Sequence, residues 1–144
     1  MARVLVIDDD PGIVSLLQRI ITKRGYQALI AHNGKEGLAL TQQYHPDLIF
    51  TDIKMPDMNG DELTVLLKSN PDFATVPIVI LSGTAYLVDL ATTQADAILN
   101  KPFELKAVYS LLDHFLAVGQ DIGYKAEELE NPSGAIAEEY PSAL

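Results

Sequence analysis

The stretch Val4-Leu-Val-Ile-Asp-Asp-Asp-Pro11 joins an unbroken apolar run to three acidic residues and a proline. Four apolar residues in a row are typical of a central parallel strand, because such a strand is buried on both faces. Asp10 is a favourable residue for a helix N-cap, and Pro11 suits the first helical position. The stretch therefore predicts a strand, an acidic turn and a helix, which together form one β/α repeat.

The predicted helix runs from Pro11 to Gly25. Apolar residues recur there at the spacing of one helix face. They are Ile13, Leu16, Leu17, Ile20 and Ile21. Gly25 predicts the end of the helix, since glycine is favoured just beyond the last helical turn.

The same alternation continues to about residue 117. Short apolar runs predict four more strands, at Gln27–Ala31, Asp47–Thr51, Val76–Leu81 and Ala97–Asn100. Helical patterns lie between and after them: one capped by Asn33 and ending near Tyr44, one marked by Leu63, Leu66 and Leu67, one from about Ala85 to Thr93, and one from about Glu104 to Ala117 with Leu105, Val108, Leu112, Phe115 and Leu116 on one face. Five repeats predict the α/β class, with a doubly wound parallel sheet, helices on both faces and right-handed crossovers.

Composition narrows the class of protein. The chain has 144 residues, which suits one domain, and it has no cysteine for disulfides or thiolate-bound zinc. The formal net charge of −10 disfavours direct binding to nucleic acid or to an anionic membrane. No stretch is apolar for long enough to be a signal-peptide core or a membrane span, so a soluble, cytoplasmic protein is expected.

The C-terminal segment differs from the rest of the chain. Residues 119–144 contain six acidic residues and one lysine, with glycine and proline but no sustained apolar period. We expect a domain at residues 1–118 and an acidic, flexible tail or linker start at residues 119–144. The tail is too short to form an output domain. For the oligomeric state of the protein we expect a monomer or a weak dimer.

Polar residues stand at the carboxyl ends of four predicted strands. Asp8 and Asp9 follow the first, Asp52 ends the third, Ser82 ends the fourth and Lys101 ends the last. In a doubly wound sheet ligands bind outside these ends, so we expect the five side chains to share one crevice. The three histidines, at positions 32, 45 and 114, fall outside these strand ends.

This set of residues favours phosphoryl-transfer chemistry. Three carboxylates in one crevice repel one another, and oxygen ligands without histidine or cysteine favour Mg²⁺ as the compensating ion. Lys101 supplies a second positive charge suited to a phosphoryl group, and Ser82 offers a hydroxyl donor. An ionised aspartate such as Asp52 can act as the nucleophile without a general base.

Four segments resemble the signature segments of response-regulator receiver domains, in the same order and at matching intervals from residue 3 to about 117. They are Val4-Leu-Val-Ile-Asp-Asp-Asp-Pro11, Pro46-Asp-Leu-Ile-Phe-Thr-Asp-Ile-Lys-Met-Pro-Asp-Met-Asn-Gly60, Pro77-Ile-Val-Ile-Leu-Ser-Gly83 and Ile98-Leu-Asn-Lys-Pro-Phe103. The resemblance implies a flavodoxin-like (βα)5 fold with strand order 2-1-3-4-5. It also implies a two-component signalling module that is phosphorylated by a histidine kinase or phosphotransfer protein and recognised by a protein target, and that is not a turnover enzyme.

The resemblance assigns roles to individual residues. Asp52 is expected to be the phosphoacceptor. Mg²⁺ is expected to bind the side chains of Asp9 and Asp52 and the backbone carbonyl of Lys54. Asp8 is expected to act through a metal-bound water.

Two more roles follow from the same resemblance. Lys101 is expected to pair with the carboxylate or the phosphate, and its peptide bond to Pro102 is expected to be cis. Ser82 is expected to move toward the phosphate and to carry the following loop with it.

Two departures keep other functions open. The stretch between Ser82 and Lys101 is a few residues shorter than is usual, and Ile98 stands where many relatives have Tyr or Phe. These departures favour, as an alternative, a pseudo-receiver that binds partners but does not switch. A Mg²⁺-dependent phosphatase with an aspartyl nucleophile is disfavoured, because Lys54 occupies the position where such enzymes carry a second aspartate.

Overall fold

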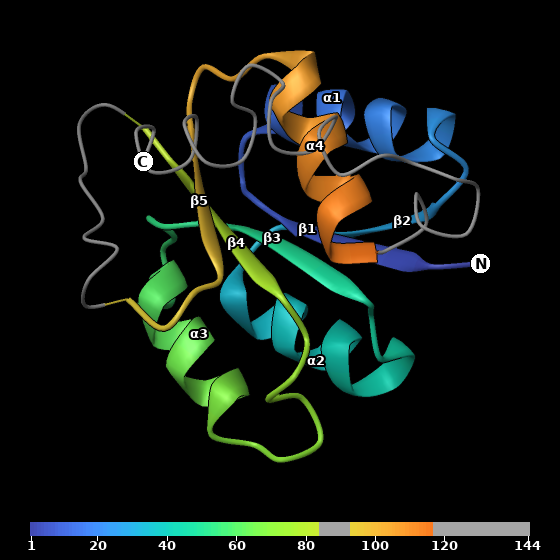
Figure 1. Ribbon diagram of the computed structural model, residues 1–144. Helices are drawn as coiled ribbons and strands as arrows, with labels where there is room; N and C mark the ends of the chain where they lie inside the picture. Colours follow the sequence, from blue (N-terminus) through green and yellow to red (C-terminus); the bar gives the residue numbers. More distant parts are fainter. Residues whose placement is uncertain (84–92, 117–144) are drawn as a thin grey trace.

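The chain forms one five-stranded parallel sheet with helices on both faces (Figure 1). The computed structural model describes residues 1–83 and 93–116. The strands are β1 (Arg3–Ile7), β2 (Gln27–Ala31), β3 (Leu48–Asp52), β4 (Ile78–Ser82) and β5 (Ala97–Asn100). Their order in the sheet is β2-β1-β3-β4-β5, as predicted for a doubly wound fold.

Among residues 1–83 and 93–116, two helices cover each face of the sheet. They are α1 (Pro11–Lys23), α2 (Gly34–Tyr44), α3 (Gly60–Lys68) and α4 (Leu105–Leu116). Helices α1 and α4 lie over one face and α2 and α3 over the other (Figure 1). Alternation along β1 divides the core accordingly, since Val4 and Val6 pack with α1 and α4 while Leu5 and Ile7 pack toward α2 and α3.

Side-chain caps fix where three helices begin. The Asp10 carboxylate accepts hydrogen bonds from the first turn of α1, where Pro11 is the first residue. Asn33 caps α2, and Asn59 caps α3 in a reciprocal capping box with Glu62. These caps confirm the helix starts predicted at Pro11 and after Asn33.

The structure corrects two strand boundaries. The third strand runs from Leu48 rather than from Asp47, because the Asp47 carboxylate instead accepts the Arg3 backbone N–H at 2.8 Å. The fourth begins at Ile78 rather than Val76, whose N–H donates to Phe73 within a turn. Each strand extends one residue beyond its predicted apolar run, and its last residue is Asp52 or Ser82, as predicted for the strand ends.

Three leucines that contribute to the apolar patterns of the predicted helices are exposed. Leu16, Leu66 and Leu105 have 37%, 51% and 50% of their surface accessible. Leu16 and Leu66 each precede a fully buried leucine, and neighbouring helical residues point about 100° apart. Leu17 and Leu67 therefore point into the core, while Leu16 and Leu66 point away from it. In α4 it is Leu111, four residues after Ala107, that packs into the core with Val108.

The helix predicted at Ala85–Thr93 falls largely outside the described residues; Thr93 itself lies in a loop before β5. The tail at residues 119–144 lies outside them entirely. Within residues 1–83 and 93–116, none of the helices combines the length and apolar character that crossing a bilayer requires.

Candidate functional site

The carboxyl ends of four strands bring the predicted polar residues together. Strand register sets β1 beside β3, with Ile7 opposite Thr51, and β3 beside β4, with Asp52 opposite Leu81. Asp8 and Asp9 therefore follow β1 at the edge where Asp52 ends β3. The sheet thus juxtaposes side chains that are separated by more than forty residues in sequence.

Lys101 connects the two buried carboxylates. Its Nζ donates to Asp8 Oδ2 at 3.1 Å and to Asp52 Oδ1 at 3.3 Å. The lysine is held at the end of β5, where its backbone N–H donates to the Ser82 carbonyl at 2.7 Å. Its peptide bond to Pro102 is cis, as the resemblance implied. The Lys101 ammonium group therefore lies between the carboxylate that follows β1 and the carboxylate that ends β3.

Asp8 is the most deeply buried acid of the site. It has no accessible surface, and its Oδ1 accepts the Asp10 backbone N–H at 3.0 Å. Burial raises the pKa of the Asp8 carboxyl, and the negative charge of Asp52 adds to this effect, while the bonds from Asp10 and Lys101 oppose it. Keeping the Asp8 carboxyl ionised therefore costs folding free energy, and a nearby cation would reduce this cost.

The pKa of Lys101 is also raised, which for an ammonium group favours the charged form. Partial burial acts to lower the pKa of its ammonium group, but the hydrogen bond and charge of Asp8, followed by those of Asp52, outweigh it and raise the pKa. Lys101 is thus held in its charged form, in which it can pair with an anion at this site.

The third acid, Asp9, completes a carboxylate cluster. Asp8, Asp9 and Asp52 each offer an oxygen, and these oxygens all lie within 4.8 Å of one another. Asp9 is exposed whereas the other two are buried, so one side of the cluster faces solvent. Three carboxylates exceed the charge that Lys101 balances, and a hard divalent cation with oxygen ligands fits this excess.

Asp52 is fixed by the first turn of α3. Its Oδ1 accepts the Ile53 backbone N–H at 2.8 Å, and Ile53 O accepts the Gly60 N–H at 2.7 Å. Gly60 lies so close that a Cβ there would come within 2.5 Å of the Asp52 carbonyl oxygen. Gly60 therefore lies directly against the backbone of Asp52.

The two remaining predicted residues occupy different environments. Ser82 is 2% exposed at the end of β4, and its Oγ donates to the Gly83 carbonyl at 3.4 Å. Lys54 is exposed in the loop after β3, two residues beyond Asp52. The structure therefore puts both next to the carboxylate cluster in the fold, and their phosphate and metal contacts stay predictions.

Asp57 is a residue that sequence reasoning missed. Its carboxylate accepts the backbone N–H groups of Gly34 at 3.0 Å and Lys35 at 2.7 Å, at the start of α2. These bonds fasten the loop that carries Lys54 to a helix on the same face of the sheet. No local pattern pairs residues 22 or 23 positions apart in the chain, so this contact had no signal in the sequence.

Ile98 is buried in a small apolar cluster beside the site. It is 2% exposed and packs with Ile53 and Ile80. Ile53 is the residue after Asp52. The position where many relatives have Tyr or Phe is therefore filled by a compact aliphatic side chain.

The histidines lie outside this cluster. His32 follows β2, nearer the strand ends than expected, and its Nδ1 lies 3.2 Å from Glu36 Oε1. His45 ends α2 with positive φ and packs on Phe73, and His114 packs against Phe115.

Comparison with known proteins agrees with this geometry. The family model described as "Response regulator receiver domain" matches residues 4–113. Protein PilH of Pseudomonas aeruginosa is 38% identical over 57% of this chain and 68% of its own length. The transcriptional regulatory protein GlrR of Escherichia coli is 34% identical over 80% of this chain, which spans only 26% of that protein. The solved structure of the chemotaxis response regulator CheY4 of Vibrio cholerae is 28% identical, with a TM-score of 0.72 over 80% of this chain and 98% of that one.

Proposed function

This chain belongs to the response regulator receiver domain family, and we propose on that basis that Asp52 accepts a phosphoryl group in a two-component signalling pathway. A histidine kinase or a phosphotransfer protein is the proposed donor, and Mg²⁺ is the proposed cofactor. The bridge from Lys101 to both Asp8 and Asp52 is the observation that carries the proposal.

Asp52 is the nucleophile in this proposal. Its Oδ1 already accepts two hydrogen bonds, and within the described residues none reaches Oδ2, which keeps its lone pairs for attack on phosphorus. A P–O bond to Asp52 forms while the P–N bond of the donor phosphohistidine breaks, and the electron pair of that bond stays on the imidazole nitrogen. The product is an acyl phosphate on Asp52.

Lys101 and Ser82 position the transferred group. The Lys101 ammonium can follow the added negative charge, because it already contacts Asp52 and is held protonated. The Ser82 hydroxyl lies at the end of the neighbouring strand, where rotation would bring it to a phosphate oxygen. Both groups then act as donors to the new anion.

The carboxylate cluster would hold the metal ion. Asp9 and Asp52 would bind it directly, the Lys54 carbonyl would add a third ligand, and Asp8 would accept from a bound water. Bound Mg²⁺ would neutralise charge on the phosphoryl oxygens and align the group for transfer.

Intact-protein mass spectrometry tests the proposal directly. With Mg²⁺ and acetyl phosphate, the parent protein should increase by one phosphoryl mass, and Asp52→Asn should not. Asp10→Asn is the matched control, since it removes a neighbouring carboxylate outside the cluster yet keeps a capping side chain. An unmodified parent protein, or an adduct that survives Asp52→Asn, would rule the acceptor role out.

A second candidate function is a pseudo-receiver that binds a partner without switching. Ile98 favours it, since this side chain is buried among isoleucines where an aromatic ring would otherwise change position. An NMR titration with beryllofluoride and Mg²⁺ distinguishes the two. Shifts that spread from Ser82 into residues 93–110 support switching, and shifts confined to the carboxylate cluster support the pseudo-receiver.

The wider setting is also part of the proposal. Receiver domains are signalling modules, and we assign this chain a stoichiometric acceptor role, without turnover of an external substrate. A protein target would recognise the phosphorylated form, and the proposed location is cytoplasmic. Longer relatives such as GlrR combine their matching region with much additional chain, so the output of the whole protein is a separate question.

A further inference from the structure

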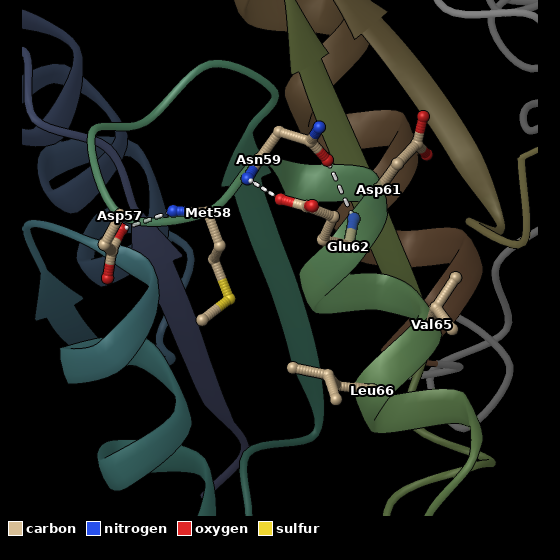
Figure 2. Close-up of a pocket in the computed structure, with 7 residues that line it drawn as sticks. All are labelled: Asp57, Met58, Asn59, Asp61, Glu62, Val65 and Leu66. Carbon is tan, nitrogen blue, oxygen red and sulfur yellow. Dashed lines mark hydrogen bonds between the residues drawn. The ribbon is translucent and has the colours of Figure 1, made fainter.

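A shallow groove lies beside the first two turns of α3, outside the carboxylate cluster. It has a volume of about 540 Å³, and the described residues that line it are Asp57, Met58, Asn59, Asp61, Glu62, Val65 and Leu66 (Figure 2). The residues come from the loop after β3 and from α3. This surface, named here the α3 groove, has no part in the phosphoacceptor site described above.

The α3 groove exposes apolar side chains that are adjacent to one another. Val65 and Leu66 are 44% and 51% exposed on consecutive positions of α3. Met58 is half-buried and extends its side chain into the space between α2 and α3, toward Leu66 (Figure 2). Adjacent exposed apolar groups rimmed by polar residues are typical of interaction sites.

The rim of the groove is acidic. Of the seven described residues that line it, three carry a carboxylate, Asp57, Asp61 and Glu62, and none is basic. Each carboxylate is held in place by a hydrogen bond: Asp57 to α2, Glu62 to the Asn59 N–H at 2.8 Å and Asp61 to the Thr93 hydroxyl at 2.6 Å. A fixed acidic rim around an apolar centre selects a basic, amphipathic partner.

The backbone beneath the groove is also fixed. Met58 packs so tightly on α2 that a Cβ at Gly34 would come within 2.4 Å of its Cγ. The Asn59–Glu62 capping box sets the start of α3. A partner would therefore meet a preformed surface, which lowers the entropy lost on binding.

From this combination we infer that the α3 groove is a docking surface for a basic amphipathic helix of a partner protein. Leucine-like side chains of the helix would cover Met58, Val65 and Leu66, and its lysines or arginines would face the three rim carboxylates. A protein helix fits better than a small molecule, because enclosed ligand pockets bury most of the ligand and this groove is open. The inference does not depend on phosphorylation of Asp52, since it concerns the unmodified protein.

Charge disfavours two other possible occupants of the α3 groove, the tail of this chain and a second copy of the chain. Residues 119–144 of this chain carry six acidic residues and one lysine, so the tail would be repelled by the acidic rim. A second copy with a net charge of −10 would bring the same acidic rim against the first. An external basic segment is the occupant that the charges favour.

The test uses the full chain, labelled with ¹⁵N, and three synthetic peptides. The first has leucines on one helical face and lysines on the other, the second has the same residues in scrambled order, and the third has glutamate in place of lysine. The first peptide should shift the amide signals of Met58, Asp61, Glu62, Val65 and Leu66. The other two should bind at least about tenfold more weakly, because they lack the apolar face or the positive charge.

A pair of matched variants locates the binding. Leu66→Lys and Leu105→Lys place the same charge at equally exposed leucines, at 51% and 50% accessibility, on different helices. Leu66→Lys should weaken binding of the first peptide about tenfold or more, and Leu105→Lys should leave it within about twofold. Circular dichroism should show both variants folded.

Other outcomes would overturn the inference. Peptide-induced shifts that cluster around Leu16 or Leu105, or equal weakening by the two variants, would place the binding elsewhere. Equal binding of the scrambled peptide would mean that only net charge is recognised. Sedimentation showing a dimer that Leu66→Lys dissociates would assign the surface to self-association.

Discussion

Gly60 lies directly against Asp52: a Cβ added to this glycine would stand 2.5 Å from the Asp52 carbonyl oxygen and 3.1 Å from the Ile53 Cα. Both neighbours are backbone atoms, which cannot rotate away as a side chain can. The first residue of α3 must therefore lack a side chain for the helix to meet the end of β3. The backbone geometry at Asp52 thus depends on a residue that has no side chain.

Gly60→Ala should lower the free energy of unfolding by about 1 to 3 kcal/mol, the usual range for an overpacked interior. Chemical denaturation measures this change. Gly12→Ala is the control, because its Cβ would meet only the Asp10 side chain, at 3.3 Å, and alanine favours a helix. The control should stay within about 1 kcal/mol of the parent. Equal stability of the two variants would contradict the close approach at Gly60.

Asp8→Asn should stabilise the protein in the absence of divalent cations. The raised pKa of Asp8 means that the fold disfavours its ionised form at neutral pH, and asparagine removes the charge while its Oδ1 can still accept the Asp10 N–H. We expect a higher free energy of unfolding than that of the parent, measured by denaturation in EDTA. Asp9→Asn, at an exposed position, should change stability little under the same conditions. A loss of stability in Asp8→Asn would show that its pairing with Lys101 outweighs burial.

Asp9→Asn should instead change how the melting temperature responds to added Mg²⁺. A ligand that binds only the folded state raises the melting temperature as its concentration rises. The parent should show such a rise, and Asp9→Asn should need about tenfold more Mg²⁺ or more for the same rise, since even partners outside the first ligand shell are worth that much. Asp10→Asn should behave like the parent. A parent melting temperature that ignores Mg²⁺ would argue against the proposed metal site.

The sequence was sufficient for the architecture because each β/α repeat carries its own signal. Apolar runs such as Val4–Ile7 predicted buried strands, and Asp10 and Asn33 marked helix starts that the structure confirms. The topology of a parallel sheet then placed Asp8, Asp52 and Lys101 at one edge. These three residues were predicted together, and the structure brings them together.

Long-range contacts were beyond the sequence for a physical reason. Periodicity reports which side of a helix is apolar, but not how wide a face the sheet can cover, so Leu16 belongs to the apolar stripe of its helix and is still 37% exposed. The Asp57 contact with α2 depends on how two loops meet in three dimensions. The exposed leucine and the Asp57 contact both lie on the surface, where local sequence preferences say little about which side chains meet.

Asp57 should also make stability depend on pH in acid. Slight burial acts to raise the pKa of its carboxyl, but backbone N–H donors of Lys35, Gly34 and Met58 outweigh burial and hold the pKa below its ordinary value of 3.8. The folded state therefore favours the ionised form, and the stabilisation is fully present above the unfolded pKa and lost as the pH falls through the lower, folded one.

Asp57→Asn removes the charge and one of the two acceptor oxygens, and should cost about 1 kcal/mol at neutral pH, as the loss of a helix cap does. The difference between parent and variant should shrink as the pH falls below 3.8, the ordinary pKa of the carboxyl. Urea denaturation between neutral pH and acid measures both effects. Asp72→Asn is the control: Asp72 is exposed, and within the described residues its carboxylate makes no hydrogen bond, so this variant should match the parent at neutral pH. A constant difference across the whole pH range would mean that Asp57 acts through shape alone, because an ionised cap must lose its advantage once both states are protonated.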